Sequence, residues 1–107
     1  MPVYKVGEIL LLTFPYTDGS GQKKRPALLV LDAGDADVLV ARITSQLYST
    51  KYDIDIKEWN KAGLLKPAVI RLHKLATLEK TFIKRSMGHL DSRDLTHVRM
   101  KLHEIFC

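Results

Sequence analysis

The sequence predicts a small, mostly β domain that ends in one α-helix. Its 107 residues suffice for one compact core. Short apolar runs bounded by turn residues recur through residues 7–90, whereas residues 91–107 repeat apolar side chains at helical spacing. Most connections between the runs are too short for crossovers, so we expect antiparallel strands. A strongly bent sheet or barrel that carries the helix is the expected architecture.

Two apolar strands are expected in the first third of the chain. One covers Gly7–Phe14 and is stopped by Pro15, and the other covers Ala27–Leu31. The intervening Tyr16–Lys24 is expected to be a loop, because its middle is an Asp-Gly-Ser-Gly turn sequence. The loop leads into three successive basic residues that end at Arg25.

The longest expected strand covers Ala36–Gln46. Strand alternation places four residues on one face: Val38, Val40, Arg42 and Thr44. This face changes from apolar to polar toward its C-terminal end. Such a change is expected where a strand leaves the core and enters a groove.

The remaining segments predict three further strands and the helix. The strands are expected over Tyr52–Ile56, Ala68–Leu72 and Phe82–Leu90, and Ile56–Ala62 is expected to make one or two helical turns closed by Gly63.

In the C-terminal helix, Asp91 or Ser92 can cap the first turn, and Asp94 adds favourable negative charge there. An apolar stripe should pack the helix on the sheet; it comprises Leu95, Val98, Leu102, Ile105 and Phe106. Its end, Ile105-Phe106, is expected to face either the core or a dimer partner.

The charge distribution favours an acidic partner. The chain has 17 basic and 12 acidic residues, a net charge of +5. Residues 1–56 hold six Lys or Arg against seven Asp or Glu, whereas residues 57–107 hold eleven against five. Nucleic acid is the first candidate for a basic half, although a solvated lysine-rich face explains the same arithmetic.

Several classes of protein are not expected. Cys107 is the only cysteine, so neither an internal disulfide nor a thiolate metal cluster is expected, which fits a reducing cytoplasm. There is no apolar run of about 18 residues, and the N-terminal stretch lacks a cleavage-site pattern. We therefore expect neither a membrane span nor a signal peptide.

Two types of residue set suit phosphodiester chemistry. Paired imidazoles are one, but no spacing pairs the four histidines, which are His73, His89, His97 and His103. The other is a cation beside a hydroxyl, which Arg25, Arg42 and Thr44 offer. An arginine that stabilises developing charge supports attack by a ribose 2′-OH without a metal ion. A salt-bridged arginine and an edge-strand threonine are the structural alternative.

A set of segments runs in order through nearly the whole chain: Gly7-Glu8-Ile9 to Phe14-Pro15, Gly19–Leu31, Ile43-Thr44-Ser45, Trp59 with Ala62–Pro67, Val69-Ile70-Arg71, Leu75–Leu78 and Gly88-His89-Leu90. Its most specific element is Arg25-Pro26-Ala27, which joins a Gly-rich loop to an apolar strand. In this set the chain resembles the MazF/PemK toxins of bacterial type II toxin–antitoxin systems.

The resemblance implies a single domain over residues 1–107. Its fold would be an SH3-like small barrel of about five to seven antiparallel strands with a C-terminal helix. The implied activity is metal-independent, cofactor-free endoribonuclease cleavage of single-stranded mRNA at short sequences in the cytoplasm. A homodimer is implied, as is an antitoxin whose disordered acidic tail blocks the basic groove.

The resemblance also implies site residues. Arg25 and Thr44 would be the catalytic pair, with Arg25 stabilising the phosphorane and Thr44 deprotonating or orienting the 2′-OH. The implied RNA contacts are Gln22, Lys23, Lys24, Arg42, Ser45, Gln46 and Arg71. The Thr17–Lys24 loop would close over the RNA and select bases. Two alternatives stay open: a non-catalytic toxin of the same barrel that poisons gyrase by contact, and a toxin that only binds its antitoxin.

Overall fold

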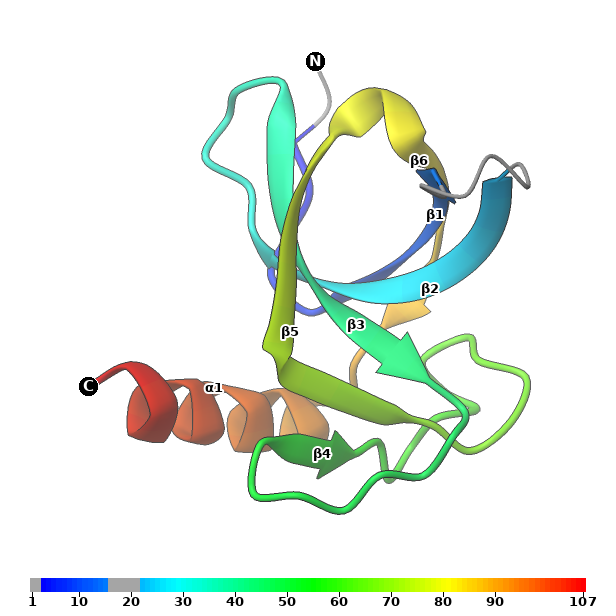
Figure 1. Ribbon diagram of the computed structural model, residues 1–107. Coiled ribbons are helices and arrows are strands. Elements are labelled where there is room, and N and C mark those ends of the chain that lie inside the picture. The colour runs from blue at the N-terminus through cyan, green and yellow to red at the C-terminus, as the bar shows by residue number, and fades with distance from the viewer. Residues whose placement is uncertain (1–2, 16–21) are drawn as a thin grey trace.

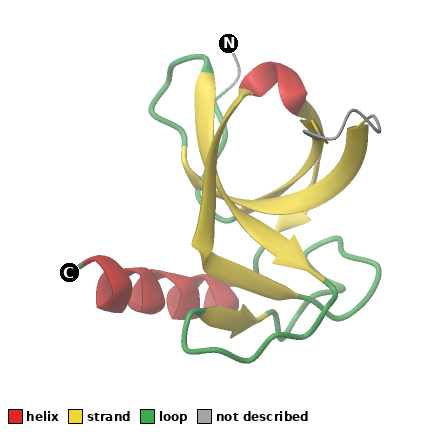
Figure 2. Ribbon diagram, in the orientation of Figure 1, coloured by secondary structure: helices red, strands yellow, loops and turns green. Residues whose placement is uncertain are grey.

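Six antiparallel strands form one sheet, and an α-helix follows, in the computed structural model, which describes residues 3–15 and 22–107 (Figures 1 and 2). The strands are β1 (Glu8–Pro15), β2 (Gln22–Leu31), β3 (Asp37–Thr44), β4 (Asp53–Asp55), β5 (Val69–Glu79) and β6 (Ile83–His89). The short 3₁₀-helix η1 (Lys80–Phe82) joins β5 to β6, and α1 covers Ser92–Phe106. The strand order is β4-β5-β3-β2-β1-β6. The expected mostly β fold is confirmed.

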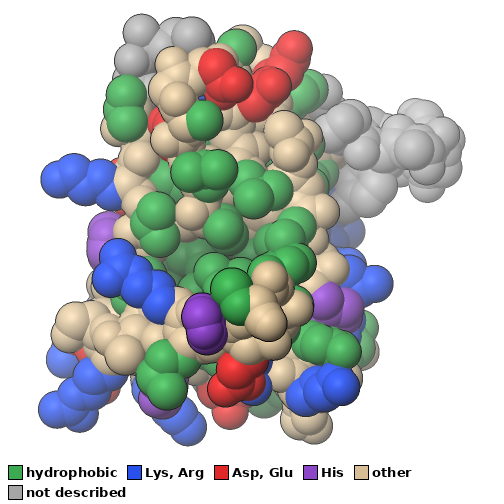
Figure 3. All heavy atoms as spheres, turned by 90° about the vertical axis from the view of Figure 1, so that its left-hand side faces the viewer, with side chains coloured by type: hydrophobic (Ala, Val, Ile, Leu, Met, Phe, Trp, Pro, Cys, Tyr) green, Lys and Arg blue, Asp and Glu red, His purple; other side chains and the backbone are tan. Residues whose placement is uncertain are grey.

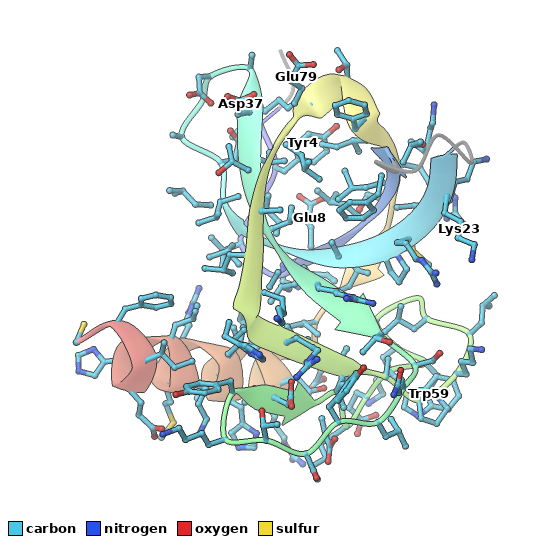
Figure 4. The ribbon with its side chains drawn as sticks, viewed as in Figure 1. Tyr4, Glu8, Lys23, Asp37, Trp59 and Glu79 are labelled. Atoms are coloured by element: carbon cyan, nitrogen blue, oxygen red, sulfur yellow. The ribbon has the colours of Figure 1, made fainter. Side chains whose placement is uncertain are left out.

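The sheet curls so that its two faces bury separate apolar clusters (Figure 1). Alternating residues of β1, β2 and β3 fill the interior of the barrel: Leu10, Leu12, Ala27, Leu29, Val38 and Val40. The opposite face packs against α1 and includes Ile9, Leu28, Ala41 and Ile43. Trp59 packs at the edge of this second cluster, in the segment that connects β4 to β5 (Figure 4).

Helix α1 begins as expected, with Asp91 accepting the N–H of Arg93 at its N-terminus. The fully buried Asp94 accepts the N–H groups of Lys57 and Glu58 and so ties that segment to the helix. Burial declines along the apolar stripe, from Val98 at 1% exposure to Phe106 at 61%. Phe106 was expected to face either the core or a dimer partner; its exposure at the last turn of α1 shows that it does not face the core.

Strand β2 begins at Gln22, five residues before the expected start. Its first residues extend the ladder with β1, pairing Lys23 with Phe14 and Lys24 with Thr13. The expected loop therefore ends earlier than Lys24, because strand pairing outweighs the polar composition. Residues 16–21 of that loop lie outside the described residues.

Strand β5 is longer than expected and bends sharply (Figure 1). Its register with β3 jumps from Arg42↔Arg71 to Ala41↔Leu75. The three residues between Arg71 and Leu75 form a bulge, which lets one strand turn a corner of the barrel.

The one or two helical turns expected over Ile56–Ala62 are present as hydrogen-bonded turns that do not extend into a helix; the N–H of Ala62 donates to the carbonyl oxygen of Glu58 at 3.1 Å. Gly63 does close the segment, with φ of +89°. A Cβ at this position would lie 2.1 Å from the carbonyl oxygen of Met87, so the chain passes too close for a side chain. None of the described helices is long and apolar enough to cross a membrane.

Candidate active-site groove

A groove opens where β2 and β3 stop pairing with each other. They pair as far as Ala27↔Arg42, beyond which β2 continues with β1 and β3 continues with β5 (Figure 1). The groove has a volume of about 460 Å³. Its described lining consists of Phe14, Arg25, Pro26, Val40, Arg42, Ile43, Thr44, Lys74, Leu75 and Ala76.

Both residues of the implied catalytic pair line this groove. Ala27↔Arg42 is the last pair of the β2–β3 register. Arg25 and Thr44 each lie two residues beyond it, Arg25 where β2 pairs with β1 and Thr44 where β3 pairs with β5. Alternation places Arg25 and Thr44 on the face of Ala27 and Val40, whose side chains belong to the barrel interior. The sheet face that forms the barrel interior therefore extends into the groove, and both polar side chains lie on this face.

The turn after β3 fixes the Thr44 hydroxyl. Thr44 Oγ1 accepts the N–H of Gln46 at 3.2 Å, and the carbonyl oxygen of Gln46 accepts the N–H of Tyr48 at 2.9 Å. Thr44 is half-buried and Arg25 is exposed, so both side chains are accessible to a ligand. The Thr44 hydroxyl keeps its own proton to donate.

The groove concentrates positive charge over an apolar floor. Arg25, Arg42 and Lys74 come from three strands, and none of the described lining residues is acidic. Such a groove attracts a polyanion, and its apolar side chains offer contact surface to unstacked bases. Two of these cations come from residues 1–56, so the charge comparison between halves of the chain did not locate the groove.

Four other predicted RNA contacts lie beside the groove rather than in its lining. Lys23 and Lys24 are exposed on β2, and Lys23 projects from its outer end (Figure 4). Ser45 and Gln46 are exposed directly after Thr44. The side chain of Gln22 and most of the Thr17–Lys24 loop lie outside the described residues.

The predicted RNA contact Arg71 is engaged within the protein. Its Nε donates to Asp53 Oδ1 at 2.9 Å, and these side chains are 11% and 1% exposed. The Arg71 Cζ lies 3.7 Å from the centre of the Tyr48 ring. Burial raises the pKa of Asp53, but hydrogen bonds from Thr50 and Arg71 outweigh this effect and hold the pKa below its usual value. Asp53 therefore neutralises Arg71, which is not in the groove lining.

The sequence did not identify Lys74 as a residue of the groove. It lies in the β5 bulge, between the paired positions Arg71 and Leu75. A bulge redirects side chains relative to a regular strand, and no turn residue marks this one in the sequence. Phe14 and Pro26 were expected only as strand and pre-strand residues.

The histidine alternative gains no support from the geometry. None of the four histidines is in the groove lining. The His73 ring packs against Tyr52 with centroids 5.1 Å apart, and His89 Nδ1 lies 2.9 Å from the Leu90 carbonyl oxygen. Among residues 3–15 and 22–107, no group of three His, Cys, Asp or Glu residues is arranged to hold a metal ion.

Solved structures share this fold at low sequence identity. "Mycobacterium tuberculosis toxin MazF-mt6" has a TM-score of 0.76 and 19% identity, over 92% of this chain and 95% of that one. A MazE-MazF structure from Deinococcus radiodurans has a TM-score of 0.78 and 17% identity, over 97% and 96%. An "Endoribonuclease in complex with its cognate antitoxin from Mycobacterial species" has a TM-score of 0.76 and 15% identity, over 97% and 93%. At these identities the likeness establishes the fold alone.

The family follows from the sequence comparison. No match is found among curated proteins. A family model described as "PemK-like, MazF-like toxin of type II toxin-antitoxin system" matches residues 5–106, which is nearly the whole chain. The chain therefore belongs to the PemK-like, MazF-like family of toxins of type II toxin–antitoxin systems.

Proposed function

We propose that this toxin is a metal-independent, cofactor-free endoribonuclease that cuts single-stranded mRNA at short sequences. The observation that carries the proposal is that Arg25 of β2 and Thr44 of β3 line one cationic groove, which opens where these two strands stop pairing. Structures of the same fold that are described as endoribonucleases support it. Because its substrate is mRNA, we place its action in the cytoplasm.

The reaction is an internal transesterification. The 2′-oxygen of the RNA attacks the adjacent phosphorus and the bond to the 5′-oxygen breaks, which leaves a 2′,3′-cyclic phosphate and a 5′-hydroxyl. Arg25 donates hydrogen bonds from its planar guanidinium to the phosphorane oxygens, where negative charge accumulates, and assists the departing 5′-oxygen. Protons lost by the 2′-hydroxyl and gained by the 5′-oxygen exchange with solvent.

Thr44 orients the reacting groups. An ordinary threonine is a poor base, but its hydrogen bond with the N–H of Gln46 sets the direction of the hydroxyl. A fixed hydroxyl in the same groove as Arg25 can hold the ribose so that the 2′-oxygen is in line with the bond that breaks.

The surrounding residues bind the RNA on either side of the scissile phosphate. Arg42 and Lys74 contribute positive charge within the groove. The polar and basic residues beside it supply further contacts to phosphates or bases: Gln22, Lys23, Lys24, Ser45 and Gln46. Because the groove is cationic, the acidic tail of a cognate antitoxin is the proposed inhibitor that occupies it.

We also propose a homodimer that covers the apolar face of the molecule. Figure 3 shows hydrophobic side chains gathered over the sheet on the side where α1 ends. Leu31, at the end of β2, is 52% exposed, and Phe106, at the end of α1, is 61% exposed. Apolar patches on monomers are usually small, and a twofold pair of identical faces covers such a surface. Sedimentation should give a dimer that Phe106→Glu weakens; a monomeric wild type contradicts this assembly.

The proposed activity is tested by incubating a long single-stranded RNA of known sequence with the protein in EDTA. Wild type should cut at a short recurring sequence. Arg25→Ala should cut about 10²- to 10³-fold more slowly, because one preorganised donor is lost. The control Arg99→Ala removes an exposed arginine of α1 outside the groove lining and should cut like wild type.

Three outcomes contradict parts of this proposal. Equal cleavage by Arg25→Ala and wild type removes the role given to Arg25. Cleavage that requires an added divalent ion removes the metal-free mechanism. RNA that stays intact while replication halts favours the gyrase-poison alternative.

A further inference from the structure

The segment after β3 places an aromatic ring on the sheet face that leads into the groove. The register across four strands runs Ala27, Arg42, Arg71 and Asp53, so these positions share one face. Arg42 lines the groove, and Arg71 is its direct neighbour on β5. The Tyr48 ring covers Arg71, with 3.7 Å between the guanidinium carbon and the ring centre. Tyr48 therefore covers β5 at Arg71, the residue that pairs with the groove residue Arg42 on β3.

The Tyr48 ring is backed by a fixed guanidinium. Asp53 holds Arg71 at 2.9 Å and is itself almost fully buried. Asp53 also accepts hydrogen bonds from the N–H and the hydroxyl of Thr50, at 2.9 and 2.7 Å. The same segment is anchored at its other end through the hydroxyl of Thr44. These contacts hold the ring in place before any ligand arrives.

We infer that Tyr48 is a stacking platform for a nucleobase that flanks the scissile phosphate. This inference rests on the proposed ribonuclease activity and gives it a specificity-determining residue. Tyr48 is only half-buried, so ring surface stays open to a ligand while the guanidinium supports the ring from behind. An aromatic ring beside a cationic groove is the arrangement that binds single strands, since the groove holds the backbone and the ring holds a base.

In this proposal Arg71 is a positioning residue rather than a direct RNA contact. Its charge is neutralised by Asp53, and its planar face is taken by Tyr48. Arg71 acts on the RNA only through the ring. Its substitution should therefore affect the same nucleotide as substitution of Tyr48.

The test measures binding without cleavage. The oligonucleotide spans the mapped cut site and carries a 2′-O-methyl group at the scissile nucleotide. A series of oligonucleotides replaces one flanking base at a time with an abasic site. Wild type should lose about 5- to 150-fold in affinity at one position, which is the usual range for a lost base stack.

The variants identify the ring at that position. Tyr48→Leu, which keeps an apolar side chain without a ring face, should bind the full oligonucleotide more weakly and show no further loss at the abasic position. Tyr48→Phe should behave as wild type. Arg71→Gln should reduce affinity only for oligonucleotides that carry this base. Thermal unfolding of each variant shows whether it is folded.

Tyr52 provides the matched control. It is a half-buried tyrosine of the same segment, but alternation assigns it to the opposite face, with the buried Ile54 and Ile56. Tyr52→Leu should keep the abasic profile of wild type. The inference is overturned if folded Tyr48→Leu still loses affinity at the abasic position or if folded Tyr48→Phe does not behave as wild type. It is also overturned if Tyr52→Leu shows the same abasic profile as Tyr48→Leu. If wild type cuts RNA, the proposed ribonuclease function stands even when the inference about Tyr48 fails. If wild type cuts no RNA, both the proposed function and the inference are overturned.

Discussion

Positive charge serves different purposes in two regions of the barrel. Near η1, Lys80 Nζ lies 3.0 Å from Asp32 Oδ1, and these side chains are 7% and 0% exposed. Asp32 also accepts the N–H groups of Tyr4 and Gly34, each at 2.8 Å. This carboxylate therefore joins three separate segments of the chain. The ion pair is part of the interior of the protein.

In the groove, by contrast, Arg25, Arg42 and Lys74 face a described lining that contains no acidic residue. Arg25 and Arg42 are exposed, so their charge is available to a ligand. Removing one partner of a buried ion pair destabilises the fold, because the other charge is left buried without a counter-charge. Charge that is gathered at the surface without a counter-charge suits a polyanionic substrate. Stability and RNA binding should therefore respond to different substitutions.

The largest expected effect comes from removing one positive charge in each region and comparing the two variants. Lys80→Met should lower Tm by roughly 10 °C or more, because it leaves the buried Asp32 carboxylate without its cation. Arg42→Met should shift Tm by less than about 4 °C but weaken RNA binding. Thermal unfolding and RNA titration measure both. A stable Lys80→Met protein, or an unstable Arg42→Met protein, would break the comparison.

Acid should expose the contribution of Asp32. The N–H donors of Tyr4 and Gly34, together with Lys80, lower its pKa from 3.8 to about 2. Because the folded pKa is below the unfolded one, the stabilisation is complete above about pH 4 and is lost as pH falls toward 2. The Tm difference between wild type and Asp32→Asn should therefore shrink with acidification in that window. A difference that is constant from pH 5 to pH 2 would argue against this role for Asp32.

The smallest expected effect is a change in the salt dependence of RNA binding when one groove cation is removed. Each phosphate contact on single-stranded RNA contributes about 0.7 to the slope of log affinity against log salt concentration. Arg42→Gln and Lys74→Gln should each reduce the slope by about this amount. Lys84→Gln, at an exposed position of β6 outside the groove lining, should leave it unchanged. Equal slopes for all proteins would show that these groove cations do not contact phosphate.

The sequence predicted the features that depend on local pattern. The change along β3 from Val40 to Thr44 follows from strand alternation alone, and the structure has that face entering a groove. Asp91 begins the helix as its capping chemistry predicts. Arg25 and Thr44 came from the family resemblance, and the structure places both in one groove lining.

The features that the sequence missed depend on distant partners. Strand pairing with β1 converts Lys23 and Lys24 from loop to strand residues. The bulge that brings Lys74 to the groove is defined by the register with β3. Asp53 is 18 positions from Arg71, and no local spacing predicts their pairing. In each case the structure depends on contacts between residues far apart in the sequence, which the local composition does not determine.

The most direct test of the Arg25 and Thr44 groove uses an RNA oligonucleotide with a single 2′-deoxy substitution at the scissile nucleotide. Wild type in EDTA should cut the all-ribose oligonucleotide to a 2′,3′-cyclic phosphate and a 5′-hydroxyl, identified by mass, and should leave the substituted one intact. Arg25→Ala should leave nearly all of both intact over the same time. Cleavage of the 2′-deoxy oligonucleotide at that position, or products with a 5′-phosphate, would contradict attack by the RNA's own 2′-hydroxyl.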